Sequence, residues 1–444
     1  MKSTTTSRAA PLPLVLEDLG LPIERSHEDD ARRVLDTAID RETFAFLSSR
    51  AHGLDVTGEL RAVVRYFKTA SGHTPEGFRR ELHLGADGVL RVDLQRDIGY
   101  GADGRLRPTN VLYSADSADP GEVAPIAPFI SNLTCNPGII YDLFINNPSA
   151  NIGGKYKNRD EVMAELGRVL GPGCDISVEL NNPFEEDFSK LLDEAAKFRE
   201  ILSPWRVVIK VPHTGPVNGA NARRLLEGDR RLGVRYTRGA TTDLLRGHNL
   251  ALRLREAGYR VNFTLMFEPY QTQMALQAKP YFINSFVRHR KMQTHRLAGF
   301  VAGYEASGDE EFLRMLRSYM VETDYLGGED DGVTPLEALL MARDVLRTRD
   351  ADGSEGPGDG LDAVRHNLRA LRNANLPETR LIVCSMEGER NYPDIDRLLA
   401  DPEFADMSRR IVVTAEPRYL ARFTSTNQVV TYQRRFLNAA NGES

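Results

Sequence analysis

The sequence contains little cysteine and no long apolar run. Its three cysteines, Cys135, Cys174 and Cys384, lie far apart and show no metal-ligand spacing, so we expect buried, reduced thiols and no zinc site. No stretch approaches the roughly 18 to 20 uncharged apolar residues of a membrane span. The N-terminal stretch APLPLVLEDLG reaches acidic residues too soon for a signal peptide. We therefore expect a cytoplasmic protein without a membrane partner.

Positive charge is not in excess either. The chain has 57 Lys and Arg against 63 Asp and Glu, which gives a net charge of -6. This balance argues against a nucleic-acid partner held by a basic face. Hydrophobic residues make up 41% of the 444 residues, a share typical of globular proteins when glycine is added. The length allows one large domain with additions.

From about residue 108 the sequence repeats one pattern, in which a short run rich in Val, Ile and Leu is followed by a helical stretch. Eight such runs end at Asp116 and Asn136, surround Glu179 and Lys210, and begin at Val261, Tyr281, Arg380 and Arg409. Alternating strands and helices require a parallel sheet. Eight repeats in roughly 310 residues fit a closed (β/α)8 TIM barrel of the α/β class. No G-x-G-x-x-G follows the first run, which disfavours a dinucleotide-binding fold.

We therefore divide the chain into three parts. Residues 1–107 are expected to form an N-terminal, mainly helical extension packed on the barrel, with a hairpin at the Asp-Gly turn of HLGADGVLRVDL. Residues 108–425 form the barrel, and residues 426–444 form a C-terminal tail with a last helix.

Four polar residues interrupt the apolar runs near their ends, namely Asp116, Asn136, Glu179 and Lys210. In parallel barrels the chemistry takes place at the C-terminal ends of the strands, so these positions are candidates for a site. Asp116 and Glu179 suit proton transfer. Each one alone is equally compatible with helix capping or an ion pair with Arg.

Lys210 gives the strongest signal, because it is one of only nine lysines and stands inside the run VVIKVP. Strand alternation places Val208 and Lys210 on one face, and Val207, Ile209 and Val211 on the face that suits the surrounding helices. Lys210 then points into the barrel, where desolvation is expected to lower its pKa and favour a neutral amine able to form a Schiff base. The alternative is a lysine that extends from a strand end or pairs with Glu179.

Two amides and a hydroxyl complete the set. Asn136 and Asn262 offer neutral hydrogen-bond donors to substrate hydroxyls, and Thr264 shares a strand face with Asn262. Hydrogen bonding in turns is the alternative role of such amides.

Taken together, these segments resemble the transaldolases and the related fructose 6-phosphate aldolases, over roughly residues 108–425. LYSADSADPGEV carries Asp116, NLTCNPGII carries Thr134 and Asn136, ISVEL carries Glu179, VVIKVPHT carries Lys210, and VNFTLMFEPYQTQMALQA carries Asn262 and Thr264.

The resemblance implies a transferase of carbohydrate metabolism, as in the pentose phosphate pathway, that moves a dihydroxyacetone unit from a ketose to an aldehyde. Lys210 would form the imine with help from Glu179 and Thr264, and Asp116 would take the C4 hydroxyl proton. Asn136, Asn262 and Thr134 would bind substrate. No metal or organic cofactor is implied, and the partner would be a small sugar or sugar phosphate.

The phosphate-binding segments depart from the family. Where the family typically reads Ser-Pro-Phe-Val-Gly-Arg, this chain has Asn284 and Ser285 followed by Phe-Val and then Arg288 and His289. The second element retains Arg390 but lacks the hydroxyl two residues earlier. We assign these residues to substrate binding and leave open whether the substrate is phosphorylated.

The chain also carries long insertions near 215–245 and 291–378. They are interpreted as a changed substrate-binding region, as surface elaboration, or as a contact between copies in a homo-oligomer. Two further functions remain open. One is a Schiff-base aldolase that cleaves or joins dihydroxyacetone and an aldehyde, and the other is a non-catalytic barrel that acts as a binding or regulatory subunit.

Overall fold

The chain divides into two compact units. The computed structural model describes residues 14–97, 100–101, 111–202, 206–349, 360–384, 391–422 and 424–441. Unit 1 comprises Met1–Thr109, Gly171–Asp175 and Pro204–Arg206, and unit 2 comprises the remainder. The boundary expected at residue 108 lies outside the described residues.

Unit 1 combines short helices with a small sheet. Its helices are α1 (Glu28–Ala31), α2 (Arg41–Ser48) and α3 (Gly58–Tyr66), and its strands are β1 (Leu14–Val15), β2 (Ala38–Ile39), β3 (Gly53–Val56), β4 (Phe78–Leu84) and β5 (Val89–Arg96). The predicted hairpin is confirmed, because β4 and β5 pair antiparallel on either side of the Asp-Gly turn. β3 pairs parallel to β5, so a three-stranded sheet accompanies the expected helices.

A cluster of buried charges also lies in unit 1. The guanidinium of Arg206 has no exposed side-chain surface and forms ion pairs with Glu81, Asp93 and Asp175, the last at 2.9 Å. Glu81, His83 and Asp93 are close enough together to offer ligands to a metal ion. Two of these three side chains already pair with Arg206, so we assign the cluster a structural role.

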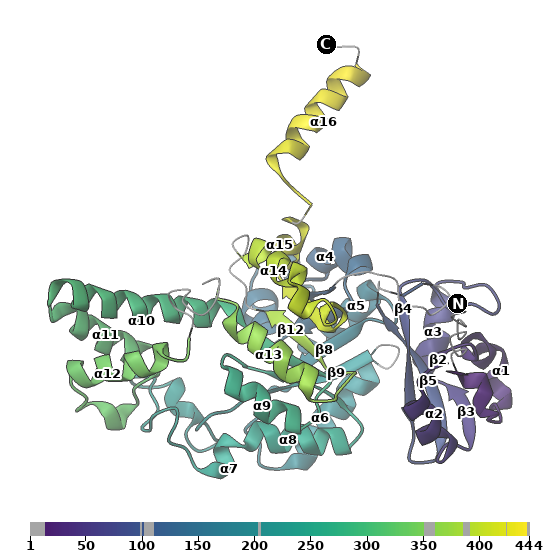
Figure 1. Ribbon diagram of the computed structural model, residues 1–444, viewed down its shortest axis with the longest axis horizontal. Coiled ribbons are helices and arrows are strands. Elements are labelled where there is room, and N and C mark those ends of the chain that lie inside the picture. Colours follow the sequence, from purple (N-terminus) through teal and green to yellow (C-terminus); the bar gives the residue numbers. More distant parts are fainter. Residues whose placement is uncertain are drawn as a thin grey trace, which may run out of the picture. The chain divides into compact units, whose positions relative to one another are not determined.

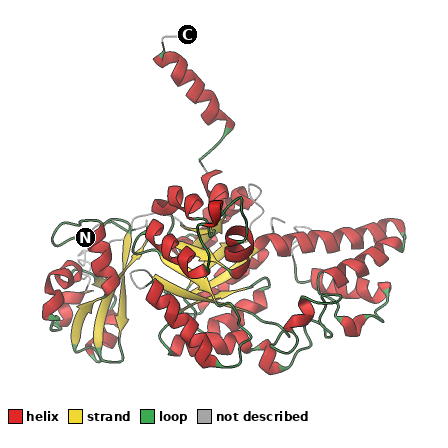
Figure 2. Cartoon of the chain, turned by 180° about the vertical axis from the view of Figure 1, so that it is seen from behind, coloured by secondary structure: helices red, strands yellow, loops and turns green. Residues whose placement is uncertain are grey.

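The eight predicted strands are all present and form a closed barrel in sequence order (Figure 2). They are β6 (Leu112–Asp116), β7 (Asn132–Cys135), β8 (Asp175–Glu179), β9 (Arg206–Pro212), β10 (Arg260–Thr264), β11 (Phe282–Phe286), β12 (Arg380–Cys384) and β13 (Ile411–Ala415). Neighbouring strands run parallel, for example β9 and β10 with Lys210 opposite Asn262. The predicted (β/α)8 architecture is confirmed.

Helices connect the strands and surround the barrel. They are α4 (Pro120–Val123), α5 (Arg159–Leu170), α6 (Phe188–Ile201), α7 (Thr241–Leu244), α8 (Arg246–Glu256), α9 (Pro269–Gln277), α10 (Val287–Ser307), α11 (Glu311–Glu322), α12 (Pro335–Leu346), α13 (Asp362–Asn373), α14 (Asn391–Ala400) and α15 (Pro417–Arg422). A π-helix, Gly138–Ile145, follows β7.

Side-chain alternation divides the barrel interior into layers. Buried side chains of Leu112, Val208, Phe282, Ile382 and Val412 belong to one apolar cluster. Two residues further along these strands stand polar side chains or cysteine, so the apolar layer lies below a polar one. The barrel therefore directs its chemistry toward the C-terminal ends of the strands.

The longer insertion builds a substructure of its own. In Figure 1, α10, α11 and α12 lie side by side, and a separate cluster of buried apolar side chains, including Leu297, Phe300, Leu316, Met320 and Leu339, holds them together. This second core shows that the insertion is folded.

The last described segment is α16 (Asn427–Ala440), which buries none of its residues (Figure 1). It agrees with the helix expected in the tail. All three cysteines are buried and free, as expected. Among the described helices we find none with the length and apolar content needed to cross a bilayer.

Candidate active site

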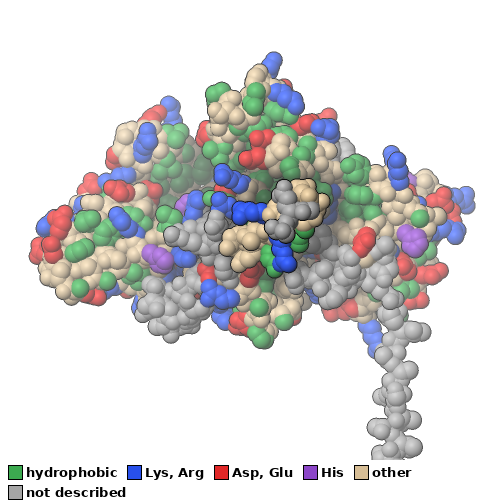
Figure 3. Space-filling model, turned by 90° about the horizontal axis from the view of Figure 1, so that it is seen from above, with side chains coloured by type: hydrophobic (Ala, Val, Ile, Leu, Met, Phe, Trp, Pro, Cys, Tyr) green, Lys and Arg blue, Asp and Glu red, His purple; other side chains and the backbone are tan. Residues whose placement is uncertain are grey.

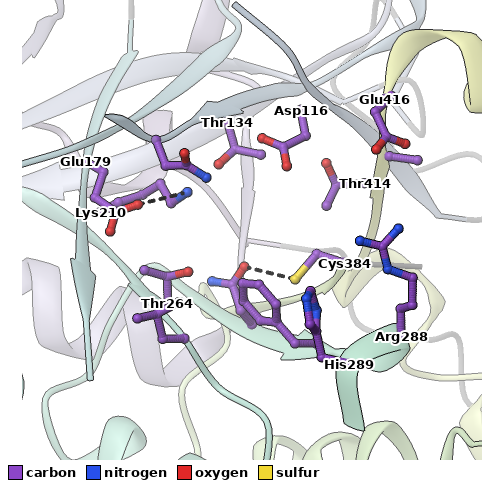
Figure 4. A pocket seen from close by; sticks show the side chains of 15 residues that line it. Asp116, Thr134, Glu179, Lys210, Thr264, Arg288, His289, Cys384, Thr414 and Glu416 are labelled. Carbon is purple, nitrogen blue, oxygen red and sulfur yellow. Dashed lines mark hydrogen bonds and ion pairs between the residues drawn. The ribbon is translucent and has the colours of Figure 1, made fainter. Parts of the chain in front are cut away.

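A cavity of about 230 Å³ opens at the C-terminal ends of the barrel strands (Figure 4). The side chains that line it come from all eight strands and the segments that follow them. They are Asp116, Thr134, Asn136, Glu179, Lys210, Thr264, Leu265, Asn284, Phe286, Arg288, His289, Cys384, Thr414, Ala415 and Glu416. The structure thus brings together all four predicted catalytic residues.

Lys210 is 5% exposed and points into this cavity (Figure 4). Its Nζ lies 3.4 Å from Oε2 of Glu179 and donates a hydrogen bond to the backbone carbonyl of Cys135 at 3.5 Å. Burial alone lowers the pKa of Lys210, but the carboxylates of Glu179 and Asp116 outweigh burial, and the pKa rises above its usual value. The expectation of a lowered pKa was therefore wrong, because the two carboxylates favour the ammonium form of Lys210.

Asp116 ends β6 and faces the cavity near Thr134 and Thr414 (Figure 4). Burial raises its pKa to about 6, with Lys210 opposing the shift and Glu416 and Glu179 adding to it. Its Oδ1 is buried and has no hydrogen-bond partner. A carboxylate with a raised pKa and a free oxygen in a cavity is suited to accept a proton from a substrate hydroxyl.

The predicted amides lie at two depths. Asn136 lines the cavity, and its Oδ1 accepts a hydrogen bond from the backbone N–H of Ile139 at 2.9 Å. Asn262 is fully buried and does not line the cavity. Its Nδ2 donates to Ser177 at 3.1 Å, and its Oδ1 accepts from Asn284 at 2.5 Å. Asn262 therefore acts on the cavity through Asn284.

These amides belong to a buried chain of hydrogen bonds across the polar layer. Ser177 donates to Asn132 at 3.0 Å, Asn132 donates to Ser114 at 2.8 Å, and the chain continues on the other side through Asn262 and Asn284. A fully connected buried network fixes the side-chain positions that it includes. Ser114, Asn132 and Ser177 were not among the residues predicted from the sequence, although strand alternation alone places them on the inner face.

Some side chains at the end of β11 and the start of α10 face the cavity, and others face the surrounding helices. Arg288 and His289 line the cavity at the first turn of α10. Burial lowers the pKa of His289, and the positive charge of the neighbouring Arg288 lowers it further. Ser285 faces outward, where its hydroxyl accepts a hydrogen bond from Asn367 of α13 at 3.3 Å. Arg290 also turns away and pairs with Asp362 at 2.6 Å and Glu268 at 3.1 Å.

Six residues that line the cavity were not expected, and three of them carry a thiol, hydroxyl or carboxyl group, namely Cys384, Thr414 and Glu416. Thr414 is 2% exposed, and its hydroxyl has no hydrogen-bond partner. Glu416 follows β13 and stands beside Arg288 in Figure 4. Thr414, like Asp116, is a polar residue at the end of an apolar run, so the same pattern would have predicted it as a site residue. Arg390, the other predicted phosphate ligand, lies outside the described residues.

The comparisons with known proteins agree with this site. The family described as Transaldolase/Fructose-6-phosphate aldolase matches residues 113–308. No curated protein matches the chain in sequence. Among solved structures, a protein described as a lactate oxidase from Pediococcus acidilactici aligns with 82% of this chain and 75% of its own, at 10% identity and a TM-score of 0.30. That likeness is too weak to carry an argument.

The matched segment spans β6 to β11 and contains Asp116, Glu179, Lys210 and Thr264. The family consists of Schiff-base enzymes, in agreement with a lysine beside two carboxylates at the carboxyl end of a barrel. Residues 113–308 thus match the transaldolase/fructose-6-phosphate aldolase family, and this match supports an aldolase-type function.

Proposed function

We propose that the protein is a transaldolase-type transferase, which moves a dihydroxyacetone unit from a ketose donor to an aldehyde acceptor. The observation that carries this proposal is the arrangement of Lys210, Glu179 and Asp116 around one cavity, with Nζ of Lys210 3.4 Å from Glu179 and Oδ1 of Asp116 unpartnered. An amine nucleophile, an acid–base group next to it and a separate base are the groups that this chemistry needs.

The first half-reaction forms the imine. Lys210 loses a proton to a neighbouring carboxylate when the ketose enters, and its Nζ attacks C2 of the ketone. The carbinolamine then loses water, with Glu179 as acid and base and the hydroxyl of Thr264 facing the same cavity. Because the ground-state amine is protonated, this proton transfer is part of the cost of imine formation.

The second step breaks the carbon–carbon bond. Asp116 takes the proton of the C4 hydroxyl, the C3–C4 electron pair moves into the imine, and an aldose leaves. The remaining three carbons stay on Lys210 as an enamine, and we assign binding of its hydroxyls to Asn136 and Thr134, which line the cavity. Addition of the enamine to a second aldehyde, followed by hydrolysis of the imine, returns the free lysine.

The charged side chains of the cavity affect whether a phosphorylated donor can bind. Arg288 and His289 offer positive charge or hydrogen bonds there, but Glu416 lines the same cavity. Arg290, which could have added a second cation, pairs with Glu268 and Asp362 instead. A carboxylate close to a phosphate dianion opposes its binding. We therefore propose a donor that need not be phosphorylated.

Borohydride trapping tests the proposal. The protein is incubated with fructose, sedoheptulose or their phosphates, reduced, and its intact mass measured; we expect a three-carbon adduct on Lys210. Lys210→Ala should show none, whereas Lys197→Met, which changes an exposed lysine, should trap as the parent does. Adding an acceptor aldehyde before reduction should remove the adduct and yield a new ketose. Release of free dihydroxyacetone instead would identify an aldolase, and absence of any adduct would favour a non-catalytic binding subunit.

A further inference from the structure

The two insertions of the barrel are bound to each other. The backbone N–H groups of Gly328 and Glu329 donate to the carbonyls of Leu232 and Gly233, each at 2.8 Å. The guanidinium of Arg235 pairs with Asp330 at 2.6 Å. The segment after β9, which contains residues 232–235, and the segment after α11, which contains residues 328–330, thus pack together as one substructure.

This substructure encloses a second cavity, which we name the insertion pocket. Its volume is about 560 Å³, against about 230 Å³ for the catalytic cavity. Its walls come from both insertions, from α10, from the start of α9 and from the loop between β10 and α9. The lining residues are Tyr236, Phe267, Glu268, Tyr270, Gln271, Gln293, Thr323, Asp324, Tyr325, Asp344, Val345, Thr348 and Arg349.

Aromatic rings form much of the wall. The rings of Tyr236 and Tyr325 meet edge to face, with centroids 5.8 Å apart and planes at 87°. Tyr236 is 40% exposed and Tyr270 is 65% exposed, so both have open surface in a pocket that they line. Burial raises the pKa of Tyr270 to about 12, and the negative charge of Glu268 makes a smaller contribution in the same direction. The phenols are neutral at physiological pH, and their rings present negatively polarised faces.

The charges of the wall are mainly acidic. Three carboxylates, Glu268, Asp324 and Asp344, line the pocket together with a single cation, Arg349. Arg349 is engaged by Glu268, by the hydroxyl of Thr294 at 3.1 Å and by that of Tyr325 at 3.2 Å. Glu268 also accepts from Arg290 at 3.1 Å. Among the described residues Asp344 has only a long, exposed ion pair with Arg347 at 3.9 Å, so the carboxylates of Asp324 and Asp344 set the charge that a ligand meets.

The insertion pocket adjoins the catalytic cavity through one ring. Phe267 contacts Phe286 and His289, with centroid distances of 4.9 and 6.2 Å, and both of these line the catalytic cavity. The side chain of Gln271 fixes this loop, because it accepts from the N–H of Phe267 at 2.6 Å and donates to the carbonyl of Leu265 at 3.0 Å. A ligand in the pocket would thus touch the loop that follows Thr264.

We propose that the insertion pocket binds a small molecule that carries a protonated or quaternary amine. A cation placed against the faces of Tyr236 and Tyr270 gains from the ring quadrupoles, and the carboxylates of Asp324 and Asp344 add attraction of the same sign. A phosphate would meet repulsion at the same place. This site goes beyond the transfer reaction, because it uses none of the residues that form or break the imine.

A pair of ligands with one shape and different charge tests the proposal on the full-length protein. Acetylcholine and its neutral carbon analogue 3,3-dimethylbutyl acetate are titrated in calorimetry at low salt. We expect acetylcholine to bind about three- to fivefold more tightly, the range of a cation–π contact with partly exposed rings. Tyr270→Leu and Tyr236→Leu should each weaken its binding severalfold, while Tyr432→Leu on the exposed helix α16 should leave it unchanged.

Lys210→Ala should bind acetylcholine as the parent does, so failure of this proposal and failure of the proposed enzyme activity are distinguishable. Equal affinity for the two ligands, no binding of acetylcholine, or binding that survives both tyrosine substitutions would each overturn the proposal. The comparison of the two ligands on the unchanged protein stands even where a tyrosine variant fails to fold.

Discussion

The raised pKa of Asp116 predicts how carbon–carbon cleavage depends on pH. In the proposed mechanism its carboxyl must be ionised to accept the C4 hydroxyl proton, and burial raises its pKa to about 6. At pH 5 roughly one-tenth of such a group is ionised, compared with more than nine-tenths of an ordinary Asp. We therefore expect the cleavage rate to fall about tenfold between pH 7 and pH 5.

The assay is single-turnover release of the aldose from a ketose donor, measured from pH 4.5 to 8. Asp116→Asn should abolish release but retain the adduct trapped by borohydride, which separates the base from the Schiff-base lysine. A release rate that stays flat down to pH 4.5 would refute the reasoning, since it would mean that the carboxylate is ionised at ordinary acidity or is not needed.

The same carboxyl affects stability. A rise in pKa from 3.8 to about 6 corresponds to roughly 3 kcal/mol of cost for the ionised form in the folded state. The folded protein then binds more protons than the unfolded chain between these values, so the contribution of Asp116 is fully present below pH 3.8 and is lost as pH rises through 6. Urea unfolding of Asp116→Asn should lack this loss; identical pH dependence in parent and variant would contradict it.

Three further substitutions test other parts of the structure. Arg206→Gln removes the cation shared by three buried carboxylates, of which Glu81 also pairs with Arg79, and should cost about 3 to 5 kcal/mol in urea unfolding; a cost below 1 kcal/mol would show that the cluster is hydrated. Glu416→Gln removes a negative charge from the cavity and should raise the kcat/KM ratio of phosphorylated to free ketose severalfold at low salt, and no change would place Glu416 outside the substrate's reach. Thr414→Val should lower activity, whereas Ser285→Ala should change it less than about twofold, because only Thr414 faces the cavity; equal effects would contradict this orientation.

Much of the barrel could be predicted because its signals are local. Each strand is a short run of Val, Ile and Leu, and side-chain alternation within such a run fixes which residues face inward. This is why Lys210 could be assigned to the interior from VVIKVP alone. The same alternation predicts that Thr414 faces inward and that Ser285 faces outward. Our prediction instead left out Thr414 and assigned Ser285 to substrate binding.

Other features depend on residues far apart in the chain. The charge on Lys210 is set by Glu179 and Asp116, which reach it from two other strands, so no local pattern predicts the sign of its pKa shift. Asn262 looked like a substrate ligand, yet its position against Ser177 and Asn284 places it beneath the cavity. Electrostatic energies depend on distance and burial, and both follow only from the closed barrel.

The sequence by itself determined the strands, the order of the barrel and most of the polar side chains that meet at the cavity, because strand periodicity and residue chemistry are properties of consecutive residues. Only the tertiary structure decided what the insertions do. Hydrogen bonds from Gly328 and Glu329 to residues almost a hundred positions earlier join the two segments, and the pocket between them exists only where these segments meet.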